Sequence, residues 1–160
     1  MGEIEDRDIR VVLEHFAAES NHDCEATLAT LADDIRYRII PGDLVMHGKE
    51  EATRYYRQWW SAFPDVNIQV ERIVSAGEWV VVEASSTGTH LGPFMGIPPT
   101  GRRVHSRVCC VIRVRDGKMV EETVYYDQLE RLLQLGSTLE LDGRCLEVPR
   151  PRQAAERVSA

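Results

Sequence analysis

The chain has 160 residues and a formal net charge of -7 at pH 7. It is long enough to bury a core without disulfides or metal, and its acidity argues against a nucleic-acid partner, because phosphate groups need a basic face. The four cysteines form no CxxC pair and no zinc-like cluster with histidine, which favours reduced thiols, no metal site and a cytoplasmic protein. No apolar run approaches the roughly 18 residues of a membrane span, and the acidic start is unlike a signal peptide.

Two helices are predicted at the start of the chain. Apolar residues recur at helical spacing over 4–20, which indicates an amphipathic first helix. Asp23 is placed to cap a second, shorter helix that carries Leu28, Leu31 and Ala32.

A short strand over 35–40 leads towards a third predicted helix. This helix begins after His47-Gly48 and stops at Pro64-Asp65. Its apolar stripe is wide and largely aromatic, and consists of Ala52, Tyr55, Tyr56, Trp59 and Phe63. Aromatic stripes of this kind are typical of a core, and those members that face a cavity would line it.

The second half of the chain is dominated by strands. Alternating apolar residues predict antiparallel strands over 66–74, 80–88 and 104–114. The segment 90–101 holds three glycines and three prolines, so it cannot continue a ladder. Asp116-Gly117 suits a two-residue hairpin turn. Helices and strands are therefore segregated, which indicates an α+β fold. We expect a strongly curved antiparallel sheet packed on three N-terminal helices and enclosing an apolar cavity.

The return strand after this turn carries a carboxylate among apolar residues. Its predicted inward row is Val120, Glu122, Val124 and Tyr126. Burial would raise the pKa of Glu122 towards neutrality, as a general base working near pH 7 requires. Glu122 is therefore the first catalytic candidate, and the alternatives are that it pairs with an arginine or that the strand faces are reversed.

His90 and Asp127 are the other catalytic candidates. His90 leads into the Gly/Pro-rich loop, where its imidazole can bind a substrate carbonyl or anchor the loop. Asp127 lies at the end of the return strand, and Glu130 follows at the spacing of a capping box, so a helix cap competes with a role at the mouth of the cavity. His15 shows no specific pattern. The candidate substrate-binding residues are Tyr37, Tyr56, Trp59, Phe63, Phe94, Met95 and Tyr126.

Several different short motifs are distributed over about residues 5–136. They are Asn21-His22-Asp23, Gly48-Lys49-Glu50, Ala62-Phe63-Pro64-Asp65, Gly88-Thr89-His90, Gly92-Pro93-Phe94, Ile97-Pro98-Pro99-Thr100-Gly101, Asp116-Gly117-Lys118 and Gln134-Leu135-Gly136. In combination they resemble the SnoaL-like polyketide cyclases, often called ester cyclases, of the nuclear transport factor two-like superfamily. The resemblance implies a cone-shaped barrel, usually dimeric through its sheet, with an apolar cavity and no cofactor. It also implies a carboxylate that removes a proton from carbon flanked by carbonyls, so that the enolate closes a ring by aldol addition.

The sequence departs from these cyclases in the last strand. Their strand commonly reads Glu-His-Trp-Asp, with the Asp as acid/base, whereas this chain reads Glu121-Glu122-Thr123-Val124. Val124 takes the position of that Asp, and Glu122 lies on the same face about 7 Å along the strand. The shift suits either a differently shaped substrate or another reaction.

The sequence thus predicts one domain over 1–136 and a C-terminal extension over 137–160 that is partly disordered. The favoured function is a cofactor-independent acid/base enzyme that acts on a hydrophobic carbonyl compound by ring closure or isomerisation. The alternatives are a non-catalytic binding or dimerisation module and an epoxide hydrolase-like enzyme, which would need an arginine such as Arg102 or Arg107 between two acids. We also expect a homodimer through the outward sheet face, which carries Trp79, His105, Cys109 and Val111.

Overall fold

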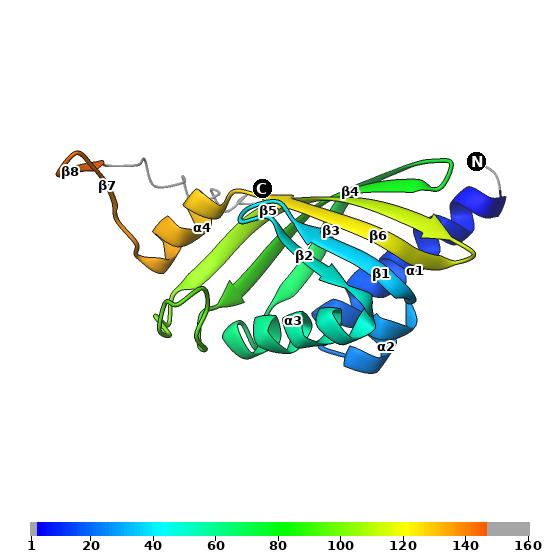
Figure 1. The fold of residues 1–160 in the computed structure, drawn as a ribbon, viewed down its shortest axis with the longest axis horizontal. Coiled ribbons are helices and arrows are strands. Elements are labelled where there is room, and N and C mark those ends of the chain that lie inside the picture. Colours follow the sequence, from blue (N-terminus) through cyan, green and yellow to red (C-terminus); the bar gives the residue numbers. More distant parts are fainter. Residues whose placement is uncertain (1–2, 147–160) are drawn as a thin grey trace, which may run out of the picture.

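The computed structural model describes residues 3–146 as a curved sheet with helices packed against it (Figure 1). The helices are α1 (Glu3–Ser20), α2 (Cys24–Ala29), α3 (Gly48–Ala62) and α4 (Gln128–Leu135). The strands are β1 (Leu31–Ile39), β2 (Leu44–His47), β3 (Asn67–Ala76), β4 (Trp79–Thr89), β5 (Arg103–Arg115), β6 (Lys118–Tyr126), β7 (Leu139–Leu141) and β8 (Arg144–Leu146). The first three helices lie on one side of the sheet, while α4 and the β7–β8 hairpin lie at one end of it. The predicted α+β class is confirmed.

The main sheet has six strands in the order β2-β1-β6-β5-β4-β3. Its neighbours pair antiparallel except for β1 and β6, which run parallel. The prediction of a wholly antiparallel sheet was therefore wrong at this one pair. A parallel pair needs a long crossover connection, and here α3 and the meander from β3 to β5 provide it.

The boundary between α2 and β1 differs from its prediction. Helix α2 ends at Ala29, and Leu31 begins β1 instead of continuing the helix. Leu31 pairs with Met119, and the register then shifts before Arg36 pairs with Glu121. This irregularity interrupts the period-two pattern, which is why the sequence revealed only the second half of the strand. Strand β2 was not predicted at all, since it is short and half exposed.

The alternation predicted for β4 and β5 is confirmed. Val82 and Cys110 are buried opposite each other, while His105 and Arg107 point outwards and are exposed. The outward face also leaves Trp79 exposed. Dimer formation through this face stays a prediction.

Strand β6 begins after the predicted hairpin turn. Asp116 and Gly117 have φ angles of 51° and 72°, which is the left-handed backbone that a two-residue turn of this type needs. A bulge then shifts the register, so that Met119 faces Val114 in the core in place of the predicted Val120. Beyond the bulge the predicted parity holds, and Glu122 faces inwards with 2% of its surface exposed.

The C-terminal extension is described only in part. The hairpin of β7 and β8 occupies 139–146, which the sequence did not predict. The Pro/Arg-rich stretch from Val148 onward lies outside the described residues. None of the helices in the described part of the chain is long and apolar enough to cross a membrane.

Candidate active site

A pocket lies between the sheet and helices α1, α3 and α4. Its volume is about 50 Å³. It is lined by Phe16, Glu19, Tyr37, Tyr55, Trp59, Ile68, Ser86, Val108, Cys110, Glu122, Val124, Tyr126 and Arg131. Sites for drug-sized ligands are usually about 300 to 1,000 Å³, so a bulky substrate requires side chains of this lining to move apart. The apolar cavity expected from the sequence stays a prediction.

Glu122 is the carboxyl group that β6 places in this pocket. It pairs in register with Tyr37 on β1 and with Ile112 on β5, so it lies in the middle of the sheet. Its Oε2 atom is buried and has no hydrogen-bond partner among the described residues. Burial, with a smaller contribution from the nearby Glu19, raises the pKa of Glu122 to about 8. The carboxyl group is therefore mostly protonated at pH 7 and ionises within the physiological range.

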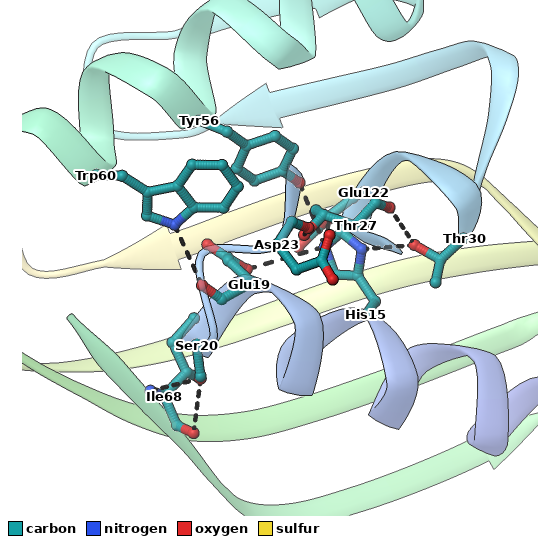
Figure 2. A network of polar contacts seen from close by, with 10 residues as sticks. All are labelled: His15, Glu19, Ser20, Asp23, Thr27, Thr30, Tyr56, Trp60, Ile68 and Glu122. Carbon is teal, nitrogen blue, oxygen red and sulfur yellow. Dashed lines mark hydrogen bonds and ion pairs between the residues drawn. The ribbon is translucent and has the colours of Figure 1, made fainter. Parts of the chain in front are cut away.

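His15 on α1 is fully buried beside Glu122, and its tautomer follows from its neighbours (Figure 2). The Thr30 hydroxyl donates its single proton to the Thr27 carbonyl at 2.6 Å, so it accepts a hydrogen bond from His15 Nδ1 at 2.8 Å. The other ring nitrogen, Nε2, then accepts from the Tyr56 hydroxyl at 3.2 Å. Burial lowers the pKa of His15 to about 4, so the imidazole is neutral at pH 7.

Glu19 brings a second carboxyl group to the same imidazole. Nε2 of His15 lies 3.8 Å from an oxygen of Glu19 and 3.8 Å from an oxygen of Glu122. Glu19 follows His15 by one helical turn on α1, and burial raises the pKa of Glu19 to about 7. Trp60 Nε1 donates to the Glu19 carbonyl at 3.2 Å and ties α3 to α1 at this point (Figure 2). The cluster thus holds two carboxyl groups whose pKa values lie near neutrality, beside a neutral imidazole.

Phenol groups supply hydrogen-bond donors beside these acids. Tyr37, Tyr55 and Tyr126 line the pocket, and Tyr56 lies behind it against His15. Burial raises the pKa of Tyr37, Tyr55 and Tyr56 above the ordinary phenol value. These hydroxyls therefore stay protonated and are able to donate to a developing oxyanion.

The remaining predicted site residues lie at varying distances from this centre. Trp59 lines the pocket, and Phe63 lines a smaller neighbouring pocket that also includes Trp59. Phe94 packs edge-on against Trp59, with ring centroids 5.6 Å apart. Met95 lies exposed at the turn of the loop and lines neither pocket.

His90 and Asp127 lie outside the lining of the pocket. His90 Nδ1 is 3.1 Å from the Thr100 hydroxyl, and its backbone bonds to Gly101 and Arg102, which closes the base of the loop. Asp127 caps α4, because its Oδ1 accepts from the Glu130 amide at 2.9 Å. The geometry of both side chains matches the structural alternatives that the sequence left open.

The sequence analysis did not single out three polar residues of this site. Glu19 and Arg131 line the pocket, and His15 lies beside it against Glu122. His15 and Glu19 belong to the buried stripe of α1, at helical spacing from Val12 and Phe16. A polar residue on a buried stripe was therefore the available signal. In the described residues no three or more His, Cys, Asp or Glu side chains are placed so that they could hold a metal ion. Arg102 and Arg107 are exposed and do not line the pocket.

Comparisons with known proteins place this chain in a family. The model of the SnoaL-like polyketide cyclases matches residues 9–135. The aklanonic acid methyl ester cyclase DnrD of Streptomyces peucetius is 37% identical over 60 residues, which are 38% of this chain and 41% of that protein. The nogalonic acid methyl ester cyclase of Streptomyces nogalater is 32% identical over 72 residues, which are 45% of this chain and 54% of that protein. The matches thus span about half or less of these curated relatives.

A solved structure extends the likeness over most of the chain. The crystal structure from Jannaschia sp. CCS1, assigned to the SnoaL-like polyketide cyclases, aligns with a TM-score of 0.79 and 25% identity. The alignment covers 84% of this chain and 95% of that one. Because the family model also spans most of the sequence, the chain belongs to the SnoaL-like polyketide cyclase family.

Proposed function

We propose that this protein is an acid/base enzyme that closes a ring in a polyketide-like carbonyl compound, with Glu122 as the general base. The observation that carries the proposal is the buried carboxyl group of Glu122, which lines the pocket. One of its oxygens has no hydrogen-bond partner in residues 3–146. Its pKa of about 8 is close to the working pH, which is the condition under which a carboxylate both accepts and returns a proton efficiently.

The proposed reaction conserves all atoms of the substrate. The Glu122 carboxylate takes a proton from carbon flanked by two carbonyls, and the resulting enolate carbon adds to a second carbonyl of the same molecule. The new alkoxide then takes a proton from a carboxyl group, either Glu122 or the neighbouring Glu19. Phenol hydroxyls such as those of Tyr37 and Tyr126 would stabilise the enolate oxygen.

The absence of the usual Asp is compatible with this proposal. Val124 stands where the family commonly has its acid/base Asp, and both Val124 and Glu122 line the pocket. Moving the carboxyl group two residues along β6 therefore keeps it in the same pocket. It would act on a substrate that is held about 7 Å further along the strand.

The test is the substitution Glu122→Gln. Since the carboxyl group is mostly protonated at pH 7, an amide of the same size replaces it without burying a new charge, and we expect the fold to be retained. Turnover should fall by about 10²- to 10⁴-fold, the usual contribution of general acid/base catalysis. Aklanonic acid, nogalonic acid and their methyl esters are the substrates to assay, with products separated by chromatography, because an internal aldol addition leaves the mass unchanged.

Glu121→Gln is the matched control. Glu121 is the neighbouring residue on the opposite face, where it pairs with Arg113 at 3.2 Å. The same chemical change should leave turnover within about twofold of wild type. Equal turnover in Glu122→Gln and wild type would remove Glu122 as the base. Ligand binding without any product in the wild type would favour the non-catalytic binding module.

A further inference from the structure

Arg131 on α4 places a buried cation in the pocket. Only 4% of the residue is exposed, and its side chain lines both the main pocket and the smaller pocket beside it. Its Nε donates to the Ser106 hydroxyl at 3.1 Å. Ser106 points inwards from β5, so this bond fixes the guanidinium over the sheet.

No carboxylate in the described part of the chain forms an ion pair with this guanidinium. Among the ion pairs of the described residues, none includes Arg131. The two acids of the pocket do not supply the balance at mildly acidic pH, because burial raises the pKa of Glu19 to about 7 and that of Glu122 to about 8. The pocket therefore carries a net positive charge below these values. A buried charge without a partner is unfavourable, and an anion that enters the pocket relieves it.

Aromatic rings surround the guanidinium on several sides. Its Cζ atom lies 3.8 Å from the ring centre of Tyr126, 5.0 Å from that of Trp59 and 6.0 Å from that of Phe94. These rings stabilise a cation through their faces and hold its plane, while they offer an apolar surface to the body of a ligand. A planar guanidinium held in this way is preorganised to form a bidentate ion pair with a carboxylate.

We propose that Arg131 anchors a carboxylate subsite, so that the ligand of this pocket is a hydrophobic carbonyl compound with a free acid group. The acid group pairs with the guanidinium, and its apolar body lies against Trp59 and Tyr126 towards Glu122. A neutral ester or amide at the same position leaves the guanidinium without a counter-charge. The inference rests on the proposed function for its substrate class, but its test measures binding alone and requires no turnover.

The test compares 2-naphthoate with 2-naphthamide, its neutral isostere, in titrations followed by ligand-observed NMR at pH 6. We expect the wild-type protein to bind the carboxylate at least tenfold more tightly than the amide. In Arg131→Gln this preference should disappear through weaker binding of 2-naphthoate. The control Arg107→Gln removes the same charge from the exposed face of β5 and should keep the preference.

Several results would overturn the subsite. They are equal affinities of the two probes for the wild type, no binding of either probe at millimolar concentration, and a preference that survives in Arg131→Gln. If Arg131→Gln does not fold, Arg131→Lys serves instead, since it keeps the charge, loses the planar fork and should retain only part of the preference. The same titration on Glu122→Gln separates the two proposals: there the preference should persist even if turnover shows that Glu122 is not the base.

Discussion

Two fully buried histidines mark two regions of the interior with different roles. His15 extends from α1 towards α3 and β6, where two carboxyl groups and a phenol lie close to its Nε2. His90 lies at the base of the Gly/Pro-rich loop, between Phe63 and Phe94, with the Thr100 hydroxyl beside its Nδ1. Both rings are equally inaccessible, so burial alone does not distinguish them.

The difference lies in what surrounds each ring. The His15 region contains groups that gain and lose protons near neutral pH, and it borders the pocket. The His90 region contains aromatic rings and backbone hydrogen bonds that hold a loop in place. We infer that the first region serves chemistry and the second serves the scaffold, and each prediction below tests one side of this contrast.

The largest effect is expected in the scaffold region, from Gly92→Ala. A Cβ atom at Gly92 would lie 2.2 Å from the Ser61 carbonyl oxygen, and the Gly92 amide already donates to the Ala62 carbonyl at 3.2 Å. The end of α3 or the loop must therefore shift, and we expect a loss of about 3 kcal/mol in the free energy of unfolding, measured in urea.

Gly96→Ala is the control for this steric effect. A Cβ atom there meets no atom within 4 Å, although its φ of +77° is unfavourable for alanine. We expect a smaller loss of about 1 kcal/mol. Wild-type stability in Gly92→Ala would mean that the loop is not docked on α3, and the scaffold role of the His90 region would fail with it.

The sequence predicted those features that depend on local periodicity. The strands β4 and β5, the Asp116-Gly117 turn and the inward direction of Glu122 all follow from alternation or from turn chemistry. Glu122 stood out because it is a charged residue in an otherwise apolar row. The error at Val120 came from a bulge, which alternation does not reveal.

Features that depend on distant partners were not predictable in this way. His15 meets Tyr56 and Glu122 from α3 and β6, and no spacing within α1 indicates those partners. His90 was a candidate because it precedes a Gly/Pro-rich loop, whereas in the described part of the chain its ring contacts Thr100, Phe63 and Phe94. The sequence thus located the strand of the candidate site but not the helix α1 that packs against it.

The next largest effect is expected in the pH dependence of the free energy of unfolding, to which the His15 region contributes near neutral pH. The pKa of Glu122 is about 8 in the folded protein against 4.5 for a free glutamate, so above pH 4.5 the unfolded state releases this proton more readily and stability falls as the pH rises. The pKa of His15 is about 4 in the folded protein against 6.5 for a free histidine. His15 therefore makes stability rise with pH, but only below pH 6.5. Between pH 6.5 and 8 the acids act alone, and Glu122 contributes a loss of about 2 kcal/mol.

Urea unfolding at several pH values measures this slope. Glu122→Gln should flatten it between pH 6.5 and 8, because the amide does not ionise. Burial lowers the pKa of His90 as well, so this imidazole affects the slope on the acid side of 6.5. His90→Gln should therefore leave the slope between pH 6.5 and 8 nearly unchanged, whatever it does to the stability itself. An unchanged slope in Glu122→Gln would show that the carboxyl group is not held neutral by the fold.

The smallest expected difference compares one hydroxyl from each region. Tyr56→Phe removes the hydroxyl that donates to His15 Nε2 and leaves a buried lone pair unpaired. We expect it to lower the free energy of unfolding by about 1 to 2 kcal/mol. It should also lower the proposed turnover, because it disturbs the imidazole beside the two acids.

Thr100→Val removes the partner of His90 Nδ1, but Thr100 is exposed, so water is able to replace its hydroxyl. We expect it to lower the free energy of unfolding by less than about 1 kcal/mol and to leave turnover unchanged. Urea unfolding and the cyclase assay on both variants decide the matter. If Thr100→Val lowers turnover as much as Tyr56→Phe does, the His90 region takes part in the chemistry. A hydroxyl that only anchors a loop should not change the activation barrier of the reaction.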